Sequence, residues 1–139
     1  MKSNELTSAQ ELSIIQEALN VGPEDQSLWY YHQFLMLNLT DFAGRPTITP
    51  GFTDEDRISY VMREIEIIRE LLDDYEDVKW IYEALVEHTL SLCQLMKRPP
   101  ESDERIDLKD WLDKLREMDP MRSGRWNDME RDCGLAEVE

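Results

Sequence analysis

The spacing of the apolar residues is the feature that most constrains the fold. Apolar side chains recur every three or four positions in successive segments, as on one stripe of a helix. No segment alternates apolar and polar residues as a half-buried strand does. The pattern therefore predicts an all-α fold. The six expected helices cover about residues 8–21, 24–39, 53–73 and 77–96, with a fifth from Leu108 and a sixth after Asp119.

Residues that start and stop helices stand between these segments. Thr53 precedes a run of acidic residues, which suits a helix N-terminus because the backbone N–H groups there need acceptors and the macrodipole favours negative charge. Asp119 is expected to cap the sixth helix, and Pro23 suits a first turn, which has no use for its missing N–H group. Two Pro-containing stretches, 41–51 and 97–107, are expected to be connecting loops.

The six helices pair into three hairpins with a common register. A tryptophan stands six positions after Pro23, Asp74 and Pro120, the residues that mark the start of each second unit, at Trp29, Trp80 and Trp126. A recurrence of roughly 20–50 residues is typical of a solenoid. We therefore expect an α-α superhelix with these three tryptophans in its core; a small up-and-down bundle with a few buried tryptophans is the alternative. A single domain over 1–139 would hold repeats at about 8–40, 53–96 and 107–133.

The charge balance excludes one class of partner. The chain has 15 Lys and Arg against 31 Asp and Glu, a formal net charge of -16. Because nucleic acids are bound by surplus basic residues, no nucleic-acid partner is expected. The acidic excess either steers a basic protein partner or forms a solvated exterior. No apolar run approaches the ~18 residues of a membrane-spanning helix, so we expect a cytoplasmic protein without membrane insertion.

The residue types that bind metals or act as nucleophiles are few. Cys93 and Cys133 lie far apart in the sequence, and only His32 and His88 could complete a metal site. We expect two reduced cysteines, no metal and no catalytic residues. Cys93 is expected to be a small buried apolar residue, and His88 a hydrogen-bonded structural residue. An independent enzyme is disfavoured, since no nucleophile with a base and no phosphate-binding glycine loop is present.

Two stretches resemble a known family. Pro23–Leu35, PEDQSLWYYHQFL, is similar to the Trp-centred motif repeated in protein prenyltransferase α subunits. Leu108–Met129 resembles the end of the α subunit of the Rab geranylgeranyltransferase type, and DPMR at Asp119–Arg122 fits that type best. The middle unit, DVKWIYEALVEHTLSLC, keeps Trp80 and little else of the motif. The resemblance covers most of the chain.

The resemblance implies a fold and a set of partners. In that family the α subunit is a crescent of helical hairpins around a β subunit, and the zinc ion and the isoprenoid and peptide pockets lie mostly in β. No cofactor is therefore expected in this chain. The α-subunit residues that approach the diphosphate belong to earlier repeats, so the chain resembles a C-terminal part. The implied partners are the β subunit, the Rab escort protein and the Rab substrate.

Two residues after the first tryptophan are candidates for partner contact. Tyr31 and His32 follow Trp29 closely, and successive helical residues point about 100° apart, so they cannot all be core. By motif position both would lie near the β-facing side; the alternative is that Tyr31 is half-buried and His32 solvated. The predicted function is a scaffold for transfer of geranylgeranyl groups to Rab cysteines, and the alternative is a non-catalytic helical-repeat module that binds proteins.

Overall fold

A computed structural model describes residues 8–40 and 53–135, and within them it contains helices and no strand. The all-α prediction is confirmed. The expected loop over 41–51 lies outside the described residues. The helices are α1 (Ser8–Val21), α2 (Gln26–Thr40), α3 (Asp54–Leu71), α4 (Lys79–Met96), α5 (Ser102–Met118) and α6 (Ser123–Asp132), with a 3-10 helix η1 (Pro120–Arg122) before α6.

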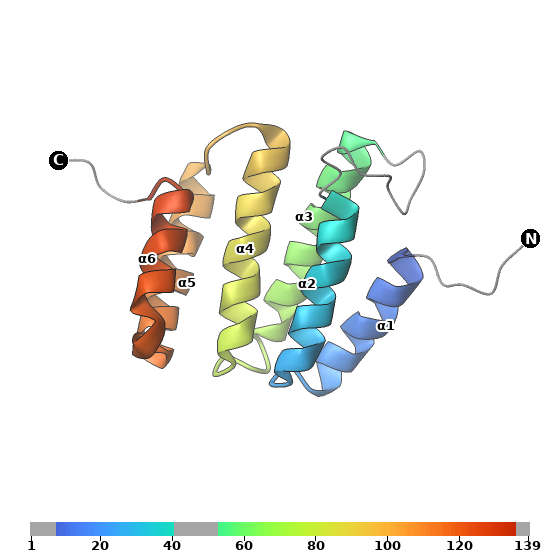
Figure 1. Ribbon diagram of the computed structural model, residues 1–139, viewed down its shortest axis with the longest axis horizontal. Helices are drawn as coiled ribbons and strands as arrows, with labels where there is room; N and C mark the ends of the chain where they lie inside the picture. Colours follow the sequence, from blue (N-terminus) through green and yellow to red (C-terminus); the bar gives the residue numbers. More distant parts are fainter. Residues whose placement is uncertain (1–7, 41–52, 136–139) are drawn as a thin grey trace, which may run out of the picture.

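The helices pack as successive antiparallel neighbours. Contacts join α1 to α2, α3 to α4 and α5 to α6, which are the three expected pairs. Further contacts join α2 to α4 and α4 to α6, so the second helices of the pairs also touch. Figure 1 shows α2, α4 and α6 side by side in one layer, with α3 and α5 behind them. A groove between α2 and α4 opens on this layer of second helices.

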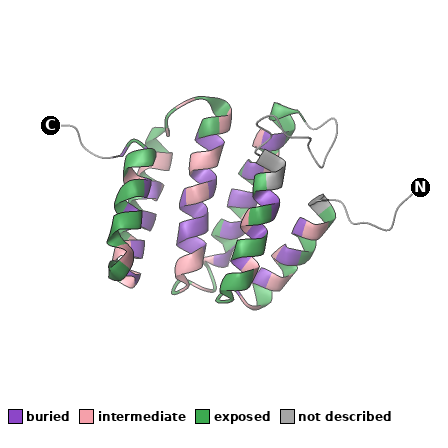
Figure 2. Cartoon of the chain, in the orientation of Figure 1, coloured by how far each residue is buried: buried purple, intermediate pink, exposed green. Residues whose placement is uncertain are grey.

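The central helix α4 carries much of the core. Its apolar residues cover more than one stripe, and it contacts α2, α3, α5 and α6. Ile81, Leu85 and Val86 are fully buried, and Figure 2 shows the buried colour along most of α4. Each such side chain contributes roughly 1.5–3 kcal/mol when it leaves water. The prediction that this helix lies between neighbours is confirmed.

Helix starts follow the local chemistry of the sequence, with one shifted boundary. The Thr53 hydroxyl accepts from the Asp56 N–H at 3.1 Å, and the Asp56 carboxylate accepts from the Thr53 N–H at 3.0 Å. This reciprocal cap confirms the predicted start of α3. Helix α5 begins at Ser102, six residues before the expected Leu108, because the Glu101 side chain and Glu104 form a second reciprocal cap. The connecting loop is shorter by the same amount.

The start of the last hairpin's second helix also differs from expectation. The Asp119 side chain makes no capping hydrogen bond, and a 3-10 turn over Pro120–Arg122 leads into α6. The Asp119 carboxylate instead accepts from Lys79 Nζ at 2.9 Å. The residue that was expected to cap α6 therefore ties the last hairpin to α4.

In each hairpin, an aromatic side chain of the second helix donates a hydrogen bond to a backbone carbonyl of the preceding turn. Trp29 Nε1 donates to the Pro23 carbonyl at 2.6 Å, and Trp126 Nε1 donates to the Asp119 carbonyl at 2.8 Å. Both tryptophans are the fourth residue of their helix and both are buried. The bond satisfies a carbonyl in the turn while the ring fills the core.

In the middle hairpin this position belongs to a tyrosine. Tyr82 is the fourth residue of α4, is buried, and donates its hydroxyl to the Glu76 carbonyl at 2.7 Å. Trp80 lies two residues earlier, is partly buried against the core, and has the Lys79 ammonium 4.8 Å from its ring centroid. The register proposed for Trp29, Trp80 and Trp126 therefore shifts by two residues in the middle hairpin, where Tyr82 takes the place of Trp80.

Candidate partner-binding surface

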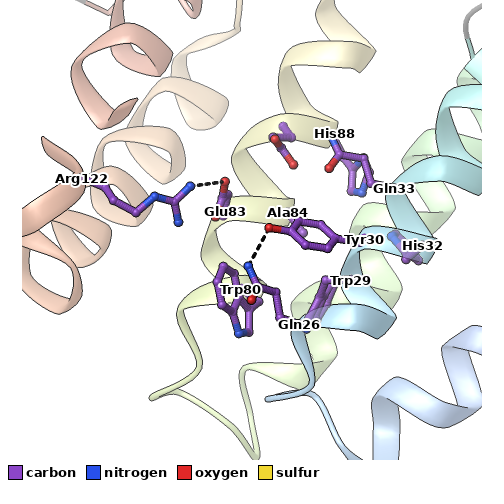
Figure 3. A pocket seen from close by; sticks show the side chains of 11 residues that line it. Gln26, Trp29, Tyr30, His32, Gln33, Trp80, Glu83, Ala84, His88 and Arg122 are labelled. Atoms are coloured by element: carbon purple, nitrogen blue, oxygen red, sulfur yellow. Dashed lines mark hydrogen bonds and ion pairs between the residues drawn. The ribbon is translucent and has the colours of Figure 1, made fainter. Parts of the chain in front are cut away.

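A groove opens between α2 and α4 on the layer of second helices. Its cavity measures about 50 Å³. Figure 3 shows the side chains of α2 and α4 turned towards each other, with Arg122 reaching in from η1. The lining residues are Gln26, Trp29, Tyr30, His32, Gln33, Trp80, Glu83, Ala84, Glu87, His88 and Arg122.

The α2 side of the groove is aromatic and uncharged. Helix α2 contains no Asp, Glu, Lys or Arg, although a third of the chain is charged. Tyr30 is 64% exposed, and its hydroxyl accepts from Gln26 Nε2 at 2.7 Å. Further along the outer face, Tyr31 stacks on Phe34 with ring centroids 6.2 Å apart. Exposed aromatic groups on an uncharged face are typical of a protein contact surface.

The α4 side of the groove carries an ion-pair network. Arg125 donates to Glu83 at 2.6 Å and to Glu87 at 2.7 Å, and Arg122 lies 3.5 Å from Glu83. Burial, followed by the Glu83 charge, raises the pKa of Glu87 above its ordinary value. Glu83 Oε1 is buried without a hydrogen-bond partner among the described residues. This oxygen is therefore an unsatisfied buried acceptor in the wall of the groove.

A buried polar cluster lies beneath the groove. His32 Nε2 donates to Glu64 Oε2 at 2.7 Å, and both side chains are 1% exposed. Gln16 Nε2 donates to the other Glu64 oxygen at 2.5 Å. The His88 ring lies edge-on to His32, with centroids 5.2 Å apart. The cluster thus joins α1, α2, α3 and α4.

The second histidine of the cluster is held neutral. Burial, with a smaller effect from His32, lowers the pKa of His88 to about 3. A fully buried imidazole without a carboxylate partner disfavours the charged form because it has left water. His88 is therefore a neutral structural residue at physiological pH.

The structure separates the two residues that the sequence singled out for partner contact. Tyr31 is 41% exposed on the outer face of α2, where a partner could reach it. His32 is 1% exposed, so its ring is neither solvated nor available for partner contact in this chain. His32 is the seventh residue of α2, and Leu85 and Met129 hold that position in the other second helices. His32 thus occupies a core position, where its Nε2 pairs with Glu64, while its Nδ1 is buried without a hydrogen-bond partner among the described residues.

Sequence reasoning missed Glu64, although a signal was present. Glu64 lies on the apolar stripe of α3, three residues after Val61 and four before Ile68. A carboxylate at a core position requires a buried donor, because an unpaired buried charge is costly. A histidine at a core position elsewhere in the chain is the complementary signal. Together they would have indicated the contact.

The two cysteines lie near the C-terminal ends of α4 and α6. Cys93 and Cys133 are free and buried, and they line one cavity. Arg98, which was not expected near a thiol, lies 3.8 Å from Cys93 Sγ because the chain turns back at Lys97. Burial nevertheless raises the pKa of both thiols, that of Cys133 to about 11. These thiols are therefore poor nucleophiles at neutral pH.

The described residues offer neither a metal-binding cluster nor a membrane-spanning helix. Over 8–40 and 53–135, no group of three or more His, Cys, Asp or Glu side chains is arranged to hold a metal ion. In the same ranges, no helix has the length and apolar character needed to cross a bilayer.

The architecture defines a class of protein: an all-α protein built from antiparallel helical hairpins. The chain is similar to geranylgeranyl transferase type-2 subunit alpha of Schizosaccharomyces pombe, with 34% identity over 124 residues. The match covers 87% of this chain and 35% of that protein, so the chain spans about a third of the relative's length. It confirms the resemblance to prenyltransferase α subunits. No family model matches the chain, and no solved structure does.

Proposed function

We propose that this chain is part of the α subunit of a type-2 geranylgeranyltransferase. In this role it supports a β subunit that transfers geranylgeranyl groups to C-terminal cysteines of Rab proteins. The observation that carries the proposal is the 34% identity to the type-2 α subunit over 87% of the chain. The three helical hairpins and the aromatic face of α2 support it, because an α subunit of this kind acts by presenting helical surfaces.

The chain's contribution is structural rather than chemical. The buried thiols have raised pKa values, and His88 is held neutral, so these groups are poorly suited to nucleophilic or acid-base catalysis at neutral pH. In the proposed complex, zinc binding and catalysis belong to the β subunit. The repeats in this chain hold that subunit and receive the Rab escort protein with its Rab substrate.

Two parts of the second-helix layer suit these two partners. The exposed pair Tyr31 and Phe34 on α2 offers stacked aromatic area to the β subunit, since aromatic groups anchor interfaces at little entropic cost. The groove between α2 and α4, which Tyr30 and Arg122 line, is assigned to the escort protein. His32 acts indirectly, by fixing the orientation of α2 through Glu64.

Co-purification with a type-2 β subunit tests the proposal, followed by a transfer assay with escort protein and Rab. We expect the chain to bind β, and Tyr31→Ala with Phe34→Ala to weaken that binding at least about tenfold, as loss of interface anchors does. The matched control is Ile106→Ala, which removes another exposed apolar side chain, 62% exposed, from α5. If the double variant and Ile106→Ala bound the β subunit equally well, the α2 face would not be part of the interface.

A free-standing protein-binding module is the second candidate. One observation favours it: the core is a single cluster that includes residues of all six α-helices, so the chain has a core of its own. This candidate predicts a helical monomer that ignores the β subunit. The same co-purification therefore distinguishes the two functions.

A further inference from the structure

A second groove lies between α3, α4 and α5 and shares no lining residue with the first. Its cavity measures about 250 Å³, and a neighbouring hollow of about 350 Å³ continues it along α3. Three residues, Glu66, Arg69 and Trp111, line both hollows. The cavity of about 250 Å³ is large enough to receive one side chain of a partner protein, and the hollow beside it extends the groove along α3.

The floor of this second groove is apolar. Ile65, Leu92 and Trp111 are buried there, whereas Met62 is 51% exposed at its edge. The Trp111 ring is 7% exposed, and its indole N–H donates to no group in the part of the chain that the structure describes. By contrast, Trp29 and Trp126 both donate to carbonyl groups. The floor therefore offers apolar area and one unused donor.

Carboxylates line both edges of the groove. On the α3 side they are Glu66, Glu70 and Asp73. Because these residues are four and three positions apart, they lie on the same side of α3 and the turn that follows it. On the α5 side they stand at Asp103 and Asp107, four residues apart. Glu104 also lines the cavity but is paired with Arg98.

Little positive charge offsets these carboxylates. Arg69 is the basic residue of the lining; it donates to Asp107 at 2.9 Å and lies over the Trp111 ring at 5.4 Å. Within residues 8–40 and 53–135, the carboxylates of Glu66, Glu70, Asp73 and Asp103 form no ion pair. In the first groove, by contrast, two arginines engage the two glutamates. The second groove is therefore the more negative of the two.

We propose that the second groove binds a basic segment of a partner protein, with one large apolar side chain on the floor and Lys or Arg side chains beside it. The apolar side chain would cover Met62 and Trp111, and the cations would pair with the two carboxylate rows. Charge complementarity selects such a segment over an acidic or neutral one and speeds its association. This inference does not rest on the proposed function, since the groove lies on other helices than the α2 face.

The test uses a short fluorescein-labelled peptide that carries one leucine between flanking lysines and arginines. The full chain should bind it saturably, and added salt should weaken binding because exposed charges are screened. Glu66→Lys with Asp103→Lys should weaken binding at least about tenfold. The matched control is Glu17→Lys with Glu24→Lys, which changes the net charge equally on the N-terminal hairpin and should leave the affinity within about twofold.

Two further arms separate a docking groove from general attraction to an acidic protein. Replacing the leucine of the peptide by serine should weaken binding, because the floor then gains no apolar contact. Met62→Gln should weaken binding of the leucine peptide and leave the serine peptide unchanged. Circular dichroism checks that each variant is folded. The inference is overturned by an absence of saturable binding, by equal losses in the two charge-reversed variants, or by equal affinity for the two peptides.

Discussion

The first and last hairpins are attached to the central pair by different chemistry. The N-terminal hairpin is joined to α3 by two hydrogen bonds of Glu64, a buried one from His32 of α2 and a part-buried one from Gln16 of α1. The C-terminal hairpin is joined to α4 by ion pairs with one exposed partner, such as Arg125, which is 40% exposed, with Glu83. Removing a partner from a buried bond leaves a group that cannot return to water, whereas a half-exposed pair is replaced by water at little cost.

The two hairpins also differ in the surface they present. The outer face of α2 is uncharged and aromatic, whereas α6 carries Arg125, Asp128, Glu130, Arg131 and Asp132 among ten residues. An uncharged aromatic face gains from being covered, and a charged face is already stable in water. The proposed partner contact therefore falls on the uncharged face of the N-terminal hairpin rather than on the charged face of α6.

The largest expected effect compares the aromatic residues that fasten each hairpin. Trp29→Ala and Trp126→Ala should each lower the free energy of unfolding by about 3–5 kcal/mol, because each removes a buried ring and a donor to the preceding turn. Trp80→Ala should cost less than half as much, since this ring is only partly buried. Urea unfolding followed by circular dichroism measures all three. If Trp80→Ala lowered the free energy of unfolding as much as the other two changes, Trp80 and not Tyr82 would be the equivalent of Trp29 and Trp126.

The next effect addresses the buried attachment of the first hairpin. Glu64→Ala should cost about 3 kcal/mol, because it leaves the buried His32 and the partly buried Gln16 without their acceptor. Glu64→Gln, which keeps one carbonyl oxygen, is the milder control. The same urea titrations apply. A loss below about 1 kcal/mol for Glu64→Ala would mean that apolar packing alone holds the first hairpin.

The pH dependence sharpens the same point. The pKa of His88 is about 3 in the folded chain against an ordinary value of 6.5, so the unfolded chain takes up the proton first as pH falls. The stability that neutral His88 confers is fully present above about pH 6.5 and is lost towards pH 3, by up to about 1.4 kcal/mol per pH unit. Stability measured from pH 7 to 4 should fall more steeply for the parent chain than for His88→Leu. Parallel curves would contradict a neutral His88.

The smallest effect concerns the attachment of the last hairpin. Arg125→Ala should cost less than about 1 kcal/mol, because the arginine is 40% exposed and its pairs with Glu83 and Glu87 are screened by solvent. The difference between parent and variant should shrink further in high salt. Chemical unfolding at low and high salt measures it. A loss as large as that of Glu64→Ala would remove the contrast between the two hairpins.

Local chemistry made most of the helices predictable, and its failures have physical causes. The apolar period placed α1 at its observed bounds, and Thr53 with the acidic residues after it marked the start of α3. The start of α5 was missed because its first turns are polar apart from the exposed Ile106, so no apolar period is visible before Leu108. A reciprocal cap at Glu101 decides that start, and glutamate is an uncommon cap.

Contacts between distant residues were harder to predict than helices. The pair His32 and Glu64 is separated by 32 positions, and helical spacing carries no information about such partners. The prediction for the middle hairpin failed for another reason. Trp80 matched the spacing of the other two tryptophans, but the side chain that donates to the preceding turn is Tyr82. A register based on tryptophan alone therefore fails in a hairpin where a tyrosine supplies the aromatic ring and the hydrogen-bond donor.

Sedimentation velocity of an equimolar mixture of this chain and a type-2 geranylgeranyltransferase β subunit tests the account most directly. The account predicts one faster-sedimenting complex, which Tyr31→Ala with Phe34→Ala dissociates and Ile106→Ala does not. Two separate boundaries, from a chain that is helical and monomeric by itself, would contradict the α-subunit role and favour an independent protein-binding module.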